Sequence, residues 1–137
     1  MIQDFWINLP VKDLGRSKEF FTALGFKFNT VHGKSASSAC LLVGEKNVIL
    51  MLFDEPTFNG FIQSEIHSAT RTDEVLLSIG VQSKEEVDVL AQKAIDAGGK
   101  SNHKPHNMTG FMYGCIFSDP DGHRWNVLFK DQSVMGN

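Results

Sequence analysis

The sequence has 137 residues, of which 42% are hydrophobic and 21% charged, and its formal net charge is −3. This length and composition are typical of one globular domain and exclude a disordered chain. Its 13 basic residues are scattered, whereas a nucleic-acid surface needs clustered lysines and arginines. The first residues lack the basic region of a signal peptide, and no apolar run is long enough to cross a membrane. We therefore expect a cytoplasmic protein with no nucleic-acid or membrane partner, whose Cys40 and Cys115 are buried free thiols.

The first half of the chain predicts a strand, a helix and three further strands. Residues 5–11 are rich in aromatic and branched side chains, which favours a strand. Asp13 then suits the N-cap of a helix whose apolar residues recur at helical spacing, and Gly25 suits the position just beyond its end. The further strands are expected at residues 26–31, 39–43 and 48–53.

The second half predicts the same order of elements, after a connecting loop with a short helix at residues 54–73. Residues 75–81 read as a strand. Ser83 and Glu86 have the spacing of a capping box at the start of a helix, and Gly98-Gly99 is expected to end that helix. The remaining strands are expected near residues 100–104, 111–117 and 124–129.

This repetition predicts the fold class. Each half alone would leave one face of its sheet exposed, so the halves are expected to pack together. We predict a single α+β domain over residues 1–137, made of two βαβββ modules at about residues 1–54 and 74–131 that form a cleft.

Three segments resemble a known superfamily and together cover nearly the whole chain. They are INLPVKDLGRSKEFFTALGF at residues 7–26, LLSIGVQSKEEVDVLAQKAIDAGG at residues 76–99, and GFMYGCIFSDPDGHRWNVLF at residues 110–129. These segments resemble the glyoxalase/bleomycin-resistance/extradiol-dioxygenase (vicinal oxygen chelate) superfamily, and within it bacterial lactoylglutathione lyase-like proteins. The resemblance implies the paired βαβββ fold and a homodimer. It does not fix the reaction, because the superfamily includes lyases, dioxygenases, epimerases, thiol transferases and drug-binding proteins.

The resemblance also implies four positions for ligands of a divalent metal, one on each of four strands. Here they fall at Trp6, within residues 50–52, at Leu76 and at Asn126. Indole has no lone pair for a metal, and leucine and methionine side chains offer no hard ligand. Asn126 offers one neutral oxygen, which does not hold a transition metal. We therefore predict no metal and no other cofactor, which argues against a glyoxalase-type isomerisation.

On the same resemblance, Trp6 and Asn8 face the cleft, while Ile7 and Leu9 face the helix. Trp6 is either a stacking surface for a ligand or core filling at a former metal position. Asn8 either contacts a ligand or makes a structural hydrogen bond, because a polar group in an apolar strand needs a partner.

Phe111, Tyr113 and Asn126 are the candidate cleft residues of the second half. Phe111 and Tyr113 follow a segment at residues 107–110 that we expect to be a flexible loop, so they suit a pocket rim, although aromatic side chains in strands more often belong to the core. Asn126 would point into the cleft.

Three functions from different classes remain. The first is a binding module that holds a small organic molecule in an apolar cleft without the usual metal. The second is a metal-dependent lyase or dioxygenase with relocated ligands drawn from His67, His103 and His106. Of these, His103 and His106 are expected to share one exposed loop. The third is a structural or regulatory dimer with no ligand.

Overall fold

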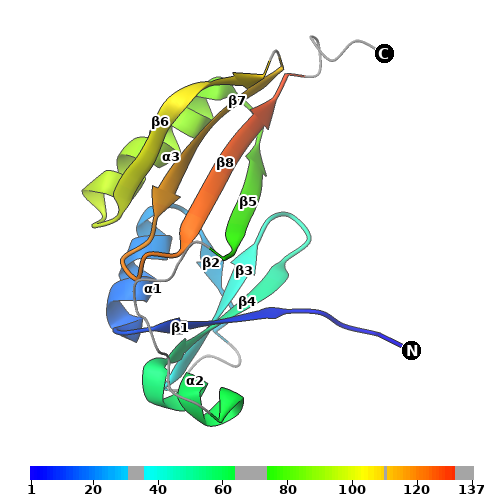
Figure 1. Cartoon of the computed structure of the whole chain (residues 1–137), viewed down its shortest axis with the longest axis vertical. Coiled ribbons are helices and arrows are strands. Elements are labelled where there is room, and N and C mark those ends of the chain that lie inside the picture. The colour runs from blue at the N-terminus through cyan, green and yellow to red at the C-terminus, as the bar shows by residue number, and fades with distance from the viewer. Residues whose placement is uncertain (31–35, 64–73, 110, 132–137) are drawn as a thin grey trace. The chain divides into compact units, whose positions relative to one another are not determined.

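The computed structural model describes residues 1–30, 36–63, 74–109 and 111–131 of the chain (Figure 1). The chain divides into two compact units, Met1–Ala69 and Thr70–Asn137. The division falls within the connection that the sequence predicts at residues 54–73. No helix in the described ranges is long and apolar enough to cross a membrane.

The described residues of the first unit form a four-stranded sheet with two helices. Strand β1 pairs in parallel with β4, and β4–β3 and β3–β2 are antiparallel pairs, which gives the order β1-β4-β3-β2. The elements are β1 (Ile7–Val11), α1 (Leu14–Ala23), β2 (Lys27–Phe28), β3 (Ser38–Val43), β4 (Val48–Asp54) and α2 (Glu55–Ile62).

Both predicted ends of α1 are confirmed. Asp13 is the N-cap, and its carboxylate accepts the N–H of Arg16 at 3.0 Å. At the other end Gly25 has φ +94°, and the N–H of Phe26 donates to the carbonyl of Phe21 at 2.9 Å. The rings of Phe21 and Phe26 lie 5.3 Å apart between centroids, which is the hydrophobic contact that accompanies a Schellman end.

The core of the first unit comes from alternate positions of its strands and from one face of α1. In β4, Leu50 and Leu52 are buried while their neighbours are more exposed. The other large apolar side chains of this core are Val11, Leu14, Phe20, Phe21, Leu24 and Leu41.

The second unit repeats the first one, and the fold class is confirmed. Its sheet has the order β5-β8-β7-β6, again with the first strand parallel to the last. The elements are β5 (Leu76–Val81), α3 (Lys84–Asp96), β6 (Lys100–Thr109), β7 (Met112–Ser118) and β8 (Arg124–Lys130).

Helix α3 begins with the predicted N-cap at Ser83, and Glu86 reaches back as in a capping box, but to the N–H of Gln82 rather than that of Ser83. The hydroxyl of Ser83 accepts the N–H of Glu86 at 3.1 Å, and the Glu86 carboxylate accepts the N–H of Gln82 at 3.0 Å. The helix ends at Asp96, two residues before Gly98, whose φ of +104° is the left-handed conformation that suits glycine.

The turn between β7 and β8 is built around a buried carboxylate. Asp119 is 4% exposed, and its Oδ1 accepts the N–H groups of Asp121 and His123, both at 3.0 Å. Its Oδ2 accepts the indole N–H of Trp125 at 3.3 Å. Burial raises the pKa of the Asp119 carboxyl, while the charge of His123 and the bond from Trp125 act in the opposite direction. This turn therefore ties a buried polar group to the largest buried side chain of the unit.

One expectation about the second unit is wrong. Strand β6 extends to Thr109, well beyond the predicted residues 100–104. His103 and His106 therefore lie in a strand rather than in a loop, and so do residues 107–109 of the expected flexible segment. Propensity misses this strand because its sequence is polar and contains Pro105, both of which are tolerated at a sheet edge.

Candidate ligand-binding site

The sheet of the second unit has two chemically different faces. Helix α3 packs on the face that carries Cys115, Phe117, Trp125 and Val127, all of them buried. Because side chains alternate along a strand, the intervening residues share the opposite face, which we call the open face. Its members in β5, β7 and β8 include Ser78, Gly80, Gly114, Ile116, Asn126 and Leu128.

Ser78 and Asn126 form a polar pair on the open face. They are register partners in β5 and β8, and the amide Nδ2 of Asn126 donates to the Ser78 hydroxyl at 3.3 Å. The amide oxygen of Asn126 is buried and accepts no hydrogen bond within the described residues. Exchanging the oxygen and nitrogen of the Asn126 amide would not satisfy it, because Nδ2 would then occupy the buried position and lack an acceptor. A buried amide with one unsatisfied group costs about 1–3 kcal/mol, so a partner from outside the described residues would be favourable.

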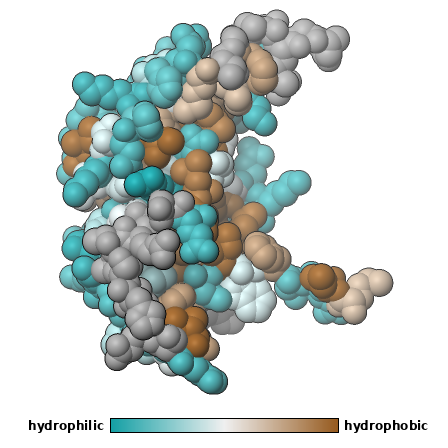
Figure 2. Space-filling model, in the orientation of Figure 1, coloured by the Kyte–Doolittle hydropathy of each residue, from teal (hydrophilic) through white to brown (hydrophobic). Residues whose placement is uncertain are grey.

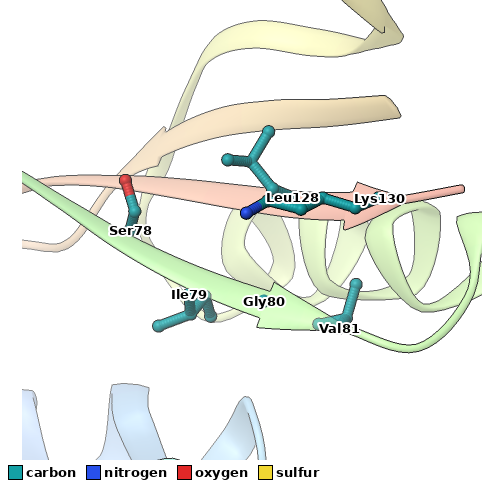
Figure 3. A pocket seen from close by; sticks show the side chains of 6 residues that line it. All are labelled: Ser78, Ile79, Gly80, Val81, Leu128 and Lys130. Atoms are coloured by element: carbon teal, nitrogen blue, oxygen red, sulfur yellow. The ribbon is translucent and has the colours of Figure 1, made fainter. Parts of the chain in front are cut away.

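A pocket of about 410 Å³ lies along β5, next to this polar pair (Figure 3). Ser78 belongs to both, because it lines the pocket and also bonds to Asn126. The other residues that line the pocket are Ile79, Gly80, Val81, Leu128 and Lys130. The volume lies within the range of about 300–1,000 Å³ that is usual for small-molecule sites, and the walls combine apolar groups with one hydroxyl and one ammonium.

Two of the predicted cleft residues do not join this pair. Tyr113 lies on the face that α3 covers, where its hydroxyl donates to Asp88 at 2.6 Å, and this bond raises the pKa of the tyrosine. The structure therefore does not bring Tyr113 together with Asn126, because alternation along β7 and β8 separates them. Phe111 is half-buried just before β7, and its carbonyl accepts the N–H of Asp131 at 2.7 Å.

The two candidates of the first unit are exposed. Trp6 precedes β1 and is 52% exposed. Asn8 is exposed on β1 and is the register partner of Met51 on β4. Ile7 pairs with the buried Leu50, so Ile7 lies on the opposite face to Asn8, as expected.

Side chains at the implied metal positions do not fit a divalent metal. On β4 the residue that shares a face with Asn8 is Met51, and on β5 the partner of Asn126 is Ser78 rather than Leu76. The thioether and amide of the first unit are weak neutral donors, and so are the hydroxyl and amide of the second unit. The described residues contain no group of three or more His, Cys, Asp or Glu that could hold a metal ion.

The histidines proposed as relocated ligands are only partly described. His103 and His106 both lie on β6 with ring centroids 6.1 Å apart, and the Nδ1 of His106 is 2.7 Å from the carbonyl oxygen of Lys104. His67 lies outside the described residues. His123 lies in the β7–β8 turn, where its backbone bonds to Asp119.

The two cysteines are buried and free, as predicted. Burial raises the pKa of the Cys40 thiol and raises that of Cys115 to about 11, with a further contribution from the charge of Asp88. Burial that raises the pKa of a thiol disfavours the nucleophilic thiolate, so neither side chain suits nucleophilic chemistry.

Sequence reasoning missed Ser78, Gly80 and Lys130. The signal for the first two was present in LLSIGV, where the small residues Ser78 and Gly80 alternate with the large ones Leu77, Ile79 and Val81. Such alternation separates an open face from a core face. Lys130 had no comparable signal, because a lysine at the end of a strand is common at any surface.

Comparisons with known proteins define the class of this chain. Residues 4–41 match the family model of bleomycin resistance protein-like N-terminal domains. The chain is similar to a glyoxalase-related enzyme from Fulvimarina pelagi, with 19% identity, a TM-score of 0.81, and 95% and 89% of the two chains covered. A glyoxalase/bleomycin resistance protein/dioxygenase family enzyme from Burkholderia phytofirmans is similar at 20% identity and a TM-score of 0.76, over 91% and 96%. The chain therefore has the fold of these glyoxalase/bleomycin resistance/dioxygenase structures.

One relative of higher sequence identity shows the family of this chain. The hypothetical protein SA1046 from S. aureus is 37% identical to this chain, with a TM-score of 0.83 and 94% of each chain covered. The chain therefore belongs to the same family as the S. aureus protein. No curated protein matches it.

Proposed function

We propose that this protein binds a small organic molecule on the open face of its second sheet, without the metal usual for the superfamily. The amide of Asn126 carries the proposal, because its oxygen is buried and has no donor within the described residues. A ligand N–H or O–H would satisfy it. The pocket beside Ser78 supplies the apolar surface that such a ligand needs.

Phe111 is proposed as a further ligand contact of the second unit, and Trp6 and Asn8 are proposed as a separate ligand-binding surface of the first unit. The exposed indole of Trp6 offers a flat surface for stacking, and the exposed Asn8 offers both a donor and an acceptor. Tyr113 is left out, because its hydroxyl already bonds to Asp88.

A neutral aromatic amine, N-phenyl-1-naphthylamine, tests the proposal. Its rings suit an apolar wall and its single N–H suits the Asn126 oxygen. We expect saturable binding by fluorescence titration, weakened roughly fivefold in Asn126→Leu, because a neutral hydrogen bond contributes about 1 kcal/mol. Leucine has a similar shape and leaves no unsatisfied amide, so urea unfolding should show that the variant is at least as stable as the wild type.

Two results would overturn the proposal. One is the absence of saturable binding to the wild-type protein, or binding to Asn126→Leu as tight as to the wild type. The other is a stoichiometric, tightly held nickel, zinc, iron or manganese in the purified protein, which would favour the alternative of a metal-dependent lyase or dioxygenase with relocated ligands.

We also propose that the protein is a cytoplasmic homodimer. Residues 1–6, which we call the N-terminal arm, expose Met1, Ile2 and Phe5, and Figure 2 shows apolar beside polar surface along this arm. Burial of such side chains against a second copy would be favourable. Light scattering after size exclusion should give twice the chain mass, and Phe5→Ser should shift the protein toward monomer. A monomeric wild type would contradict this.

The two buried free cysteines support a reducing compartment, which is the basis for proposing a cytoplasmic protein.

A further inference from the structure

The pocket along β5 carries one charged group, and that group is a cation. Among the six residues that line it, Lys130 alone is ionisable. The acidic residue nearest to it in the sequence, Asp131, does not line the pocket. Figure 3 shows the Lys130 side chain running back along β8 in the direction of Leu128.

The surroundings of Lys130 within the sheet are apolar. Its register partner on β7 is Met112, and Leu128 precedes it by two residues on the same face of β8. Within the described residues no ion pair of Lys130 is found. Lys130 itself is exposed, so its ammonium group is accessible to an anion that enters the pocket.

The backbone of β5 leaves room beside this cation at Gly80. A Cβ added at Gly80 would come no closer than 4.0 Å to any neighbouring heavy atom, that atom being the carbonyl oxygen of Leu128. The pocket is therefore open at this position because the residue has no side chain, and a side chain placed there would enter the space that a ligand would use.

We propose that the ligand of this site carries an anionic group, such as a carboxylate, sulfonate or phosphate, which pairs with Lys130. The proposal rests on the proposed function, since it concerns the same molecule. The Cα atoms of Asn126 and Lys130 are four residues apart on one strand, which is about 13 Å at the usual rise. The ligand then has an anionic end and, within that span, an N–H or O–H for the Asn126 amide.

The probe that tests this is 5-anilinonaphthalene-1-sulfonate, which is N-phenyl-1-naphthylamine with one sulfonate added on the other ring, away from the N–H. We expect it to bind more tightly than the neutral amine at low salt, and to lose that advantage as salt is raised. Lys130→Met keeps an apolar chain and removes the charge, so it should weaken sulfonate binding roughly tenfold and abolish the preference for the sulfonate over the neutral amine. Lys130→Arg should retain the sulfonate preference.

Two control variants locate the effect. Lys100→Met removes an exposed lysine from β6 at the other edge of the same sheet, and should leave both probes unaffected. Gly80→Val fills the pocket and should weaken both probes. Equal binding of both probes by the wild type, or a Lys130→Met variant that binds the sulfonate normally, would overturn this inference while the proposed function stands. Failure of both probes to bind saturably would overturn the proposed function and the inference with it.

Discussion

The two units share one topology but close their last hairpins in different ways. In the first unit, residues 44–47 join β3 to β4 as an exposed turn with one backbone hydrogen bond, from Asn47 to Gly44 at 3.1 Å. In the second unit, the corresponding turn holds the buried carboxylate of Asp119, which accepts three hydrogen bonds, one of them from the buried Trp125. The same hairpin is therefore closed by backbone conformation in one unit and by a buried polar network in the other.

This difference accompanies the candidate site. Strand β8 follows the Asp119 turn. Its Trp125 side chain points toward the core, and its Asn126 side chain points toward the open face. A turn that is held rigidly by hydrogen bonds fixes the position of the strand that follows it. The amide of a binding residue on that strand is then also held in a defined position. The β3–β4 hairpin of the first unit presents Met51 beside Asn8 and makes no comparable polar pair within the described residues.

The largest effect is expected for Asp119→Ala. The variant leaves two backbone N–H groups and the indole N–H of Trp125 without their acceptor, so we expect a loss of about 3–5 kcal/mol in the free energy of unfolding. Urea-induced unfolding followed by the fluorescence of Trp125 measures it. Glu45→Ala in the turn of the first unit is the matched control and should change stability by less than about 0.5 kcal/mol. Similar losses in the two variants would remove the contrast between the turns.

The elements on the core side of each sheet could be predicted from the sequence. Asp13, Gly25, Ser83 and Gly98 are local signals whose chemistry depends on a few neighbouring residues, and each one lies where the pattern indicates. Strand β6 was predicted too short, because its pairing with β7 is a tertiary effect that overrides its low propensity.

The open face could be predicted only in part. The alternation along β8 correctly separates Asn126 from the core residues Trp125 and Val127. The placement of Tyr113 with Asn126 failed, because the sequence does not show which face of β7 the helix covers. The neighbour of Asn126 on β5 could not be predicted either, because it depends on the register of the two strands. Strand pairing shows that this neighbour is Ser78 and not Leu76.

A smaller effect is expected for Gly114→Ala, and it contrasts two glycines of one sheet. A Cβ at Gly114 would lie 2.5 Å from the carbonyl oxygen of Val127 and 2.8 Å from a methyl group of Leu128. A backbone atom moves only with its strand, so we expect a loss of about 1–3 kcal/mol by urea unfolding. Gly80→Ala meets no such contact and should stay within about 0.5 kcal/mol of the wild type. A tolerated Gly114→Ala would mean that β7 and β8 shift more easily than their pairing suggests.

The smallest effects are expected at the two helix caps, where the units are most alike. Asp13→Ala and Ser83→Ala each remove a side-chain acceptor for one N–H of the first turn, at a cost of about 1 kcal/mol. The costs should differ slightly, because α1 has no acidic residue in its first turn, whereas α3 keeps Glu85 and Glu86 near its N-terminus. We therefore expect Asp13→Ala to lose more stability than Ser83→Ala in paired urea titrations at low salt, and the gap to narrow when salt is raised. Asp13→Asn keeps the acceptor without the charge and should fall between Asp13→Ala and the wild type. A larger loss in Ser83→Ala would mean that acidic residues in the first turn do not replace a charged cap.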